Sequence, residues 1–265
     1  MTDQTSPVSQ HPLGWLDVVS PDIATTTAFL EKLFGWVEAN RVDVEGNDYL
    51  FLADSGRPMH GAEQIRPDQG SARWTVFVTA PDARSLVARA EAAGGKVGFP
   101  PTALADLGVI AMVTDPLGAT LGIWQPLALV PASVETAAAP LVAARLGTED
   151  LGRTSAFLRE VFGWTPFEDG PPADDHEPGA ASPRSPGRDF LRLRTGGAVA
   201  ELLASDQGEW IPVFRDTRAG LGELAISLGG TASQVDGDTI RVADPAGAEF
   251  LLTGCPEPRP GNVTA

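Results

Sequence analysis

Cysteine is nearly absent from this chain of 265 residues, because Cys255 is its one thiol. An intramolecular disulfide is therefore excluded, and no histidine stands near Cys255 in the sequence to activate it as a nucleophile. The first residues, MTDQTSPVSQHP, have neither the basic start nor the apolar stretch of a secretory signal. Both observations predict a cytoplasmic protein.

Basic residues and long apolar runs are also scarce. Lys and Arg number 19 against 35 Asp and Glu, which gives a formal net charge of −16. Nucleic acid is not an expected partner, because phosphates are bound by clustered Lys and Arg, whereas a cationic ligand would be attracted. The acidity can equally serve solubility alone. No run approaches the ~20 apolar residues that cross a bilayer, so no membrane partner is expected.

What the chain does contain is the same motif twice. Residues 22–36 read DIATTTAFLEKLFGW, and residues 150–164 read DLGRTSAFLREVFGW. A second pair, DPLGA at 115–119 and DPAGA at 244–248, has nearly the same spacing. Two separate motifs repeated at one offset indicate duplication of a whole module.

Each module is predicted to contain the order strand, helix, three strands, twice over. In the first repeat Asp22 can cap a helix whose apolar residues recur at helical spacing, and Gly35 can end it. Module 1 is expected to have helices at 22–34 and 82–93 and strands at 13–20, 37–43, 48–53, 58–65, 73–79, 96–99, 108–114 and 119–125. Module 2 is expected to have helices at 150–162 and 217–228 and strands at 141–147, 190–194, 198–204, 210–215, 239–243 and 249–253.

The remaining segments are assigned by composition. Gly230 and Asp244 are closer together than Gly95 and Asp115, so module 2 is expected to have lost part of a hairpin. The predicted boundaries are a flexible tail at 1–11, module 1 at 12–126, a linker at 127–140, module 2 at 141–254 with a mobile Pro- and Gly-rich insert at 168–188, and a tail at 255–265.

Three motifs together resemble the vicinal oxygen chelate superfamily. They are D-x6-FL-x3-FGW after the first strand, W-x-V-x-V at 74–78, and DP-x-GA-x4-WQ at 115–125. This superfamily includes glyoxalase I, bleomycin-resistance proteins, fosfomycin-resistance enzymes and extradiol dioxygenases, and the tandem chain is similar to its glyoxalase-like proteins. The resemblance implies an α+β fold of two tandem modules, each of paired βαβββ units forming a curved, cup-shaped mixed sheet with helices on the convex face.

The resemblance also implies a divalent metal held by His or Gln, His, and Glu on the first, fifth and eighth strands. The matching positions are Trp15, Thr75 and Gly122 in module 1, and Ala143, Ile211 and Leu251 in module 2. None of these can supply the expected ligands. The three histidines, His11, His60 and His176, fall outside these positions, and a stable zinc site needs three or four convergent ligands. We therefore expect no metal and no other cofactor.

Strand alternation predicts which side chains face the cup of module 1. The set is aromatic with one carboxylate: Trp15, Asp17, Thr75, Phe77, Thr120, Gly122 and Trp124. Such a lining suits a planar or cationic small molecule. The alternative is that the aromatic side chains simply fill the cup as core. In module 2, Arg145 and Glu249 are expected to face the cup and to pair.

Three functions remain open from the sequence. The first is a metal-independent protein that binds a small aromatic or cationic molecule in the cup of module 1. The second is an enzyme of the lyase, isomerase or hydroxylase-like type, with Asp17 or His60 as general base. His60, Glu63 and Arg73 are candidate polar contacts near the cup in either case. The third is a structural module with a filled cup. The chain is expected to be a monomer with an internal pseudo-dimer, or a weak homodimer.

Overall fold

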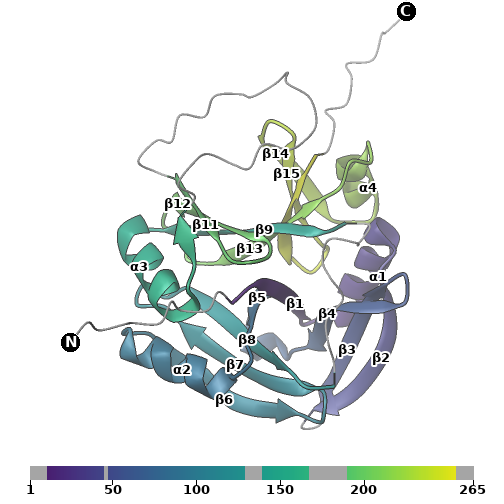
Figure 1. Cartoon of the computed structure of the whole chain (residues 1–265). Helices are drawn as coiled ribbons and strands as arrows, with labels where there is room; N and C mark the ends of the chain where they lie inside the picture. Colours follow the sequence, from purple (N-terminus) through teal and green to yellow (C-terminus); the bar gives the residue numbers. More distant parts are fainter. Residues whose placement is uncertain (1–10, 45–46, 129–138, 167–189, 255–265) are drawn as a thin grey trace, which may run out of the picture.

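Each module of the chain forms one eight-stranded mixed sheet (Figure 1). The computed structural model describes residues 11–44, 47–128, 139–166 and 190–254. Four α-helices lie within these residues, two in each module. The predicted α+β architecture of two tandem cup-shaped modules is thereby confirmed. No helix in this described part is both long and apolar enough to cross a membrane.

Module 1 follows the predicted order of elements. They are β1 (Leu13–Ser20), α1 (Ile23–Phe34), β2 (Val37–Val44), β3 (Asn47–Asp54), β4 (Arg57–Gln64), a 3-10 turn at Pro67–Gln69, β5 (Arg73–Thr79), α2 (Ala83–Ala92), β6 (Lys96–Leu104), β7 (Gly108–Thr114) and β8 (Thr120–Pro126). The strand order in the sheet is β2-β3-β4-β1-β5-β8-β7-β6. The central strand β1 is parallel to β4 and antiparallel to β5.

Module 2 repeats this plan with shorter outer strands. Its elements are β9 (Leu141–Thr148), α3 (Leu151–Phe162), β10 (Thr165–Pro166), β11 (Phe190–Arg194), β12 (Val199–Ala204), β13 (Trp210–Arg215), α4 (Leu221–Ser227), β14 (Thr231–Asp236), β15 (Thr239–Ala243) and β16 (Glu249–Thr253). The β14–β15 hairpin is shorter than its counterpart β6–β7, as expected, but β14 itself was not predicted. The predicted insert 168–188 lies outside the described residues.

The repeated motif encodes the same helix twice. Asp22 and Asp150 each accept a hydrogen bond from the backbone N–H three residues later, at 3.2 and 2.9 Å. Gly35 and Gly163 end the helices with φ of 80° and 72°, a conformation that favours glycine. The repeated spacing of Asp and Gly in the motif is therefore explained by helix capping.

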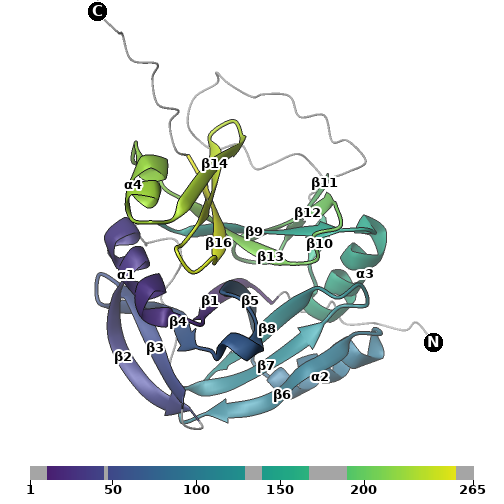
Figure 2. The ribbon, with the colours of Figure 1, turned by 180° about the vertical axis from the view of Figure 1, so that it is seen from behind.

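The two modules share one continuous hydrophobic core. Strand β5 contacts β13 and β16 across the junction, α1 lies beside α4, and α2 lies beside α3 (Figures 1 and 2). The Arg218 guanidinium donates to the Leu33 carbonyl at 2.8 Å, and Arg89 donates to the Glu160 carbonyl. His11 also reaches module 2, since its carbonyl accepts from Trp164 Nε1 at 2.7 Å.

Aromatic rings concentrate at this junction. Trp36 stacks on Phe34 at 4.5 Å between ring centroids and meets Phe214 of module 2 edge-on at 5.3 Å. Its counterpart Trp164 packs on Phe162 and Trp210 in module 2. The tryptophans of the two FGW motifs are therefore packing residues, at most 1% exposed.

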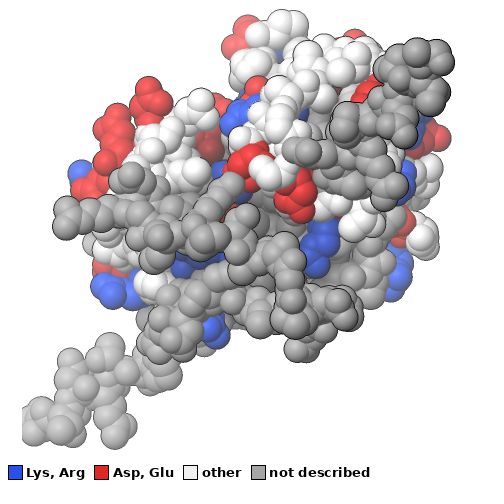
Figure 3. Space-filling view, turned by 90° about the horizontal axis from the view of Figure 1, so that it is seen from above, with Lys and Arg blue, Asp and Glu red and all other residues white. Residues whose placement is uncertain are grey.

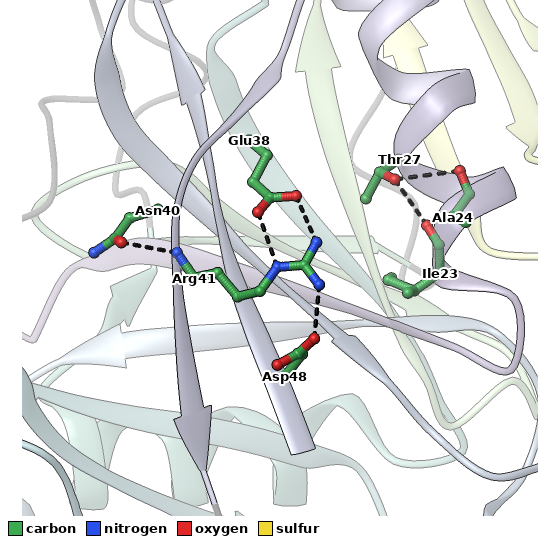
Figure 4. A network of polar contacts seen from close by, with 7 residues as sticks. All are labelled: Ile23, Ala24, Thr27, Glu38, Asn40, Arg41 and Asp48. Carbon is green, nitrogen blue, oxygen red and sulfur yellow. Dashed lines mark hydrogen bonds and ion pairs between the residues drawn. The ribbon is translucent and has the colours of Figure 1, made fainter. Parts of the chain in front are cut away.

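The outer strand β2 has a charged exposed surface. Arg41 donates through Nε and Nη2 to Glu38 at 2.9 and 2.8 Å, and through Nη1 to Asp48 on β3 at 2.6 Å (Figure 4). The two carboxylates raise the pKa of Arg41. Charged side chains on a sheet edge discourage pairing with another chain, so this network fits a protective role.

Candidate functional site

The cup of module 1 lies on the face of the sheet that points away from the shared core, and β1 contributes to both faces. Leu16 and Val18 contribute to the core between the modules, whereas Trp15 belongs to a separate cluster on the opposite face. In the register of the sheet, Trp15 lies opposite Phe77, and Phe77 lies beside Gly122. Asp17 is one level away, opposite Thr75. Trp15, Phe77 and Gly122 therefore lie at one level of the sheet, with Asp17 and Thr75 at the next.

This register corrects the positions matched to the metal ligand on the fifth strand of each module. The side chain level with Trp15 and Gly122 is Phe77, not Thr75, and in module 2 Val213 rather than Ile211 lies level with Ala143 and Leu251. Indole, phenyl and hydrogen in one module, and three aliphatic groups in the other, do not fit a divalent metal. Within the described residues, no three His, Cys, Asp or Glu side chains are grouped to hold a metal ion.

Aromatic side chains pack the cup of module 1. Trp15, Phe77 and Trp124 are at most 2% exposed. The rings of Trp15 and Trp124 are nearly parallel, with centroids 6.1 Å apart and planes inclined by 20°. Three further side chains that the sequence did not single out complete the cluster: Tyr49, Phe51 and Leu104. The alternation of β3 could have identified Tyr49 and Phe51.

Two glycines make room for these rings. A Cβ atom on Gly122 would lie 2.2 Å from the Phe77 ring, and one on Gly108 would lie 2.4 Å from the Trp124 ring. Real Cβ atoms do not approach other atoms so closely. The aromatic residues and the glycines therefore form one complementary set, in which any larger residue on β7 or β8 at these positions would displace a ring.

Asp17 places a carboxyl group beside this aromatic cluster. Its Oδ1 accepts hydrogen bonds from Trp15 Nε1 and from the Tyr49 hydroxyl, both at 2.6 Å. Gly61 on β4 allows this contact, since a Cβ there would lie 1.9 Å from the Tyr49 hydroxyl and 2.1 Å from Asp17 Oδ1. The carboxyl group is consequently held in one orientation beside the edge of the Trp15 ring.

Burial sets the protonation of Asp17. It raises the pKa of this carboxyl from 3.8 to about 7, even though the hydrogen bonds from Tyr49 and Trp15 favour the charged form. The nearby Glu63, whose own pKa is also raised by burial, adds a smaller effect in the same direction. Asp17 is therefore poised between acid and carboxylate near neutral pH, as a general base or a hydrogen-bonding anchor requires.

His60 lies on β4, the strand next to β1, and its side chain points to the opposite face of the sheet from Asp17. Its ring packs on Trp36 at 4.4 Å between centroids and also meets Trp74 and Phe214. Both ring nitrogens lack a hydrogen-bond partner, and burial lowers the pKa of His60 to about 3. The structure therefore does not bring the two predicted general-base candidates together, and His60 lines the module junction instead of the cup.

The remaining predicted contacts lie at the rim or outside. Thr75 is buried one level from Phe77, whereas Thr120 is exposed and its hydroxyl lies 3.0 Å from that of Thr114. Glu63 is half-buried beside Tyr49 in the strand register. Arg73 is exposed and donates to the Ser71 carbonyl at 3.1 Å.

The cup of module 2 has a different chemistry. Arg145, at the position equivalent to Asp17, donates through Nε and Nη2 to Glu201 at 3.0 and 2.9 Å, and Arg192 Nε lies 3.4 Å from the same carboxylate. The expected pairing of Arg145 with Glu249 is wrong, because Glu249 pairs with Arg241 at 2.6 Å. Figure 3, which views the molecule from above, shows both acidic and basic side chains on the exposed surface on this side.

Comparison with known proteins identifies the family of module 1. Residues 12–123 match the family described as Glyoxalase/Bleomycin resistance protein/Dioxygenase superfamily. Module 1 matches this superfamily over nearly its whole length. The chain is 29% identical to the anthracycline biosynthesis protein DauV of Streptomyces sp. (strain C5), over 93% of this chain and 94% of DauV. It is 28% identical to the anthracycline biosynthesis protein DnrV of Streptomyces peucetius, over 90% of this chain and 91% of DnrV.

Solved structures of two dioxygenases share the fold of the whole chain. The 2,3-dioxygenase LapB from Pseudomonas sp. KL28 aligns with a TM-score of 0.60 at 14% identity, over 95% of this chain and 96% of LapB. A homoprotocatechuate 2,3-dioxygenase from Brevibacterium fuscum aligns with a TM-score of 0.63 at 12% identity, over 95% of this chain and 82% of that chain. At these identities the likeness shows the fold alone.

Proposed function

We propose that module 1 binds a planar aromatic small molecule between Trp15 and Trp124, with Asp17 at the ligand's edge and without a metal ion. The observation that carries the proposal is the nearly parallel pair of indole rings beside a carboxyl group. Two parallel rings can each offer a face to one flat ligand once they separate, and stacking of this kind adds to the area buried.

The protonation of Asp17 supports a ligand with polar ring substituents. With its pKa at about 7, the carboxyl group can accept a hydrogen bond from a phenol or donate one to a carbonyl oxygen near neutral pH. Tyr49 fixes the orientation of the carboxyl group. One oriented polar group in an otherwise apolar lining is the usual composition of a small-molecule site.

The full-length relatives support the same ligand class. DauV and DnrV are both named for anthracycline biosynthesis. Anthracyclines contain flat fused rings that bear phenol and quinone oxygens. A ligand of that chemistry combines the stacking surface that suits Trp15 and Trp124 with the oxygens that suit Asp17.

Binding requires the packed cup to open. Leu104, at the end of β6, belongs to the cluster, and Leu107, in the turn before β7, packs against it. Strand β6 is the outermost strand of the sheet and pairs with β7 alone. Its displacement therefore disrupts pairing on one side only, and such edge elements open at low free-energy cost.

Tryptophan fluorescence tests the proposal, with 1,4-dihydroxyanthraquinone as the probe. We expect saturable quenching, with affinity reduced about tenfold in Trp124→Phe because one stacking face is smaller. Trp164→Phe is the matched control, since Trp164 is packed in module 2. Quenching that does not saturate, or that Trp124→Phe leaves unchanged, contradicts the proposal and supports a cup that is only packed core.

A second candidate is acid–base catalysis on such a ligand. It is favoured by one observation, the near-neutral pKa of Asp17. Asp17→Asn would then abolish turnover of a hydroxyanthraquinone while leaving its affinity within a few-fold. Equal turnover by the Asn variant would exclude Asp17 as the base.

A further inference from the structure

The two side chains that hold Asp17 both bind the same one of its oxygens. Trp15 Nε1 and the Tyr49 hydroxyl each donate to Oδ1 at 2.6 Å. The backbone of Gly61, whose N–H makes a weaker contact with the carboxyl group, lies on the Oδ1 side as well, since a Cβ there would be 2.1 Å from Oδ1. Within the described part of the chain, Oδ2 accepts no hydrogen bond from any side chain.

The Oδ2 atom of Asp17 is not sealed inside the protein. The Asp17 residue is 5% exposed and lies on the cup face of β1 with Trp15. The Oδ2 atoms of Asp115 and Asp244, in the turns of the two DP motifs, are fully enclosed without a partner, whereas Asp17 Oδ2 is not enclosed. The oxygen of Asp17 that lacks a protein partner is therefore the one that a ligand in the cup can reach.

This arrangement decides which oxygen carries the proton when Asp17 is neutral. In a carboxylic acid the carbonyl oxygen has two lone pairs that accept hydrogen bonds, and the hydroxyl oxygen carries the proton. The donors Trp15 and Tyr49 occupy both lone pairs of Oδ1, so a proton on Oδ1 would meet the hydrogen of a donor. The neutral acid therefore carries its proton on Oδ2 and offers it to the cup.

We propose that Asp17 binds the ligand as a neutral acid, with Oδ2 donating a hydrogen bond to a carbonyl oxygen on a flat aromatic ring system. This inference rests on the function proposed above and names the ligand class, an aromatic ketone or quinone. A carbonyl oxygen only accepts hydrogen bonds, so it gains from the neutral acid and is repelled by the carboxylate. A phenol can accept from the acid or donate to the carboxylate, so it binds either form.

The groups around Asp17 set the pH range in which the neutral acid exists. Burial raises the pKa of Asp17 to about 7. Tyr49 on β3 lowers this pKa through its hydrogen bond, and the charge of Glu63 on β4 raises it. On β5, Thr75 opposite Asp17 is uncharged, and Arg73 lowers the pKa of Glu63. Tyr49 and Glu63 thus act on the pKa of Asp17 in opposite directions.

Equilibrium dialysis of the full-length protein tests the proposal with three flat tricyclic probes of similar outline. The probe 9-fluorenone has a carbonyl, 2-hydroxyfluorene has a phenol, and fluorene has neither. At pH 6 we expect 9-fluorenone to bind about five- to tenfold more tightly than fluorene, because of one hydrogen bond. At pH 8 only about a tenth of Asp17 keeps its proton, so this advantage should be lost. The affinity for fluorene should not depend on pH, and that for 2-hydroxyfluorene should change by less than about threefold.

Variants assign the pH dependence to Asp17. In Asp17→Asn the amide oxygen takes the place of Oδ1 and the amide N–H takes that of the protonated Oδ2, so the advantage of 9-fluorenone should persist at pH 8. Glu63→Gln should move the loss of the advantage to lower pH, and Tyr49→Phe should move it to higher pH. A purely structural role of these two residues would leave the pH of that loss unchanged.

The results distinguish this inference from the function on which it rests. Equal affinities for 9-fluorenone and fluorene at pH 6 would overturn the neutral-acid assignment and leave aromatic binding in the cup intact. The same holds if the advantage persists at pH 8 in the wild-type protein, or is lost there in Asp17→Asn. Saturable binding of none of the three probes would overturn both proposals.

Discussion

Asp17→Asn is expected to change how the stability of the protein depends on pH. In the folded protein the pKa of Asp17 is about 7, against an ordinary value of 3.8, because the carboxyl group is buried. Between these two values the folded state keeps a proton that the unfolded state has lost. The contribution of Asp17 to stability is therefore complete below pH 3.8 and is lost as the pH rises through 7.

His60 has the opposite effect. Burial among aromatic rings lowers its pKa from 6.5 to about 3. Between these pH values the unfolded state binds a proton that the folded state does not bind. The stability that this neutral histidine permits is present above pH 6.5 and is lost as the pH falls through 3. From pH 4 to 6.5 Asp17 lowers the free energy of unfolding as the pH rises, and His60 raises it. The two effects largely cancel in the wild-type protein.

The magnitude follows from the two pKa differences. At about 1.36 kcal/mol per pH unit, Asp17 costs roughly 4 kcal/mol of unfolding free energy above pH 7, and His60 costs roughly 5 kcal/mol below pH 3. Removing one group exposes the other. As the pH rises from 4.5 to 6.5, the free energy of unfolding of Asp17→Asn should increase by roughly 3 kcal/mol relative to wild type. That of His60→Leu should decrease by a similar amount relative to wild type.

Urea denaturation followed by tryptophan fluorescence measures these slopes. Asn keeps an acceptor oxygen for Trp15 and Tyr49, and Leu is tolerable at position 60 because neither ring nitrogen of His60 has a hydrogen-bond partner. All other titrating groups are common to the three proteins and cancel in the comparison. Parallel pH profiles for wild type and Asp17→Asn would refute the assignment of a raised pKa to Asp17.

Further predictions concern packing, charge and metal. Gly61→Ala should lower the free energy of unfolding by about 1–3 kcal/mol, because its methyl group would collide with the Tyr49 hydroxyl and Asp17; an unchanged urea midpoint would contradict this. Glu201→Gln should cost about 3–5 kcal/mol, since it leaves the largely buried Arg145 without its carboxylate, whereas Glu249→Gln, at a half-exposed pair, should cost less than about 1 kcal/mol. Elemental analysis of protein grown with added nickel, zinc, iron and manganese should find far less than one metal per chain; a stoichiometric metal would refute the metal-free cup.

The fold was predictable because local signals and the duplication agree. Asp22 and Gly35 mark both ends of α1, and the same residues recur around α3, so capping chemistry and repeat length give one consistent answer. Strand β14 escaped prediction because its segment, TASQVD, is largely exposed and carries few apolar residues. Its place in the sheet is set by pairing with β15, a long-range property that composition does not reveal.

The sequence predicted which side chains of each strand face the cup, but not which of them lie level with one another across the sheet. Period-two alternation placed Trp15 and Asp17 on one face of β1, since one face of a strand must join the core. Which residue of β5 lies level with Trp15 depends on strand register, and the shift near Leu13 and Trp15 makes that register irregular. The position of His60 depends on how the second module covers β4, which a single strand pattern cannot show.

The shared core between the modules has a consequence for the origin and handling of this protein. A single module of this kind would expose Trp36, Trp74 and the neighbouring apolar face of its sheet, and a second copy is the natural cover for such a surface. A linker converts that association into an intramolecular step. Dilution, which would dissociate a two-chain ancestor, should therefore leave the melting temperature of the present chain unchanged.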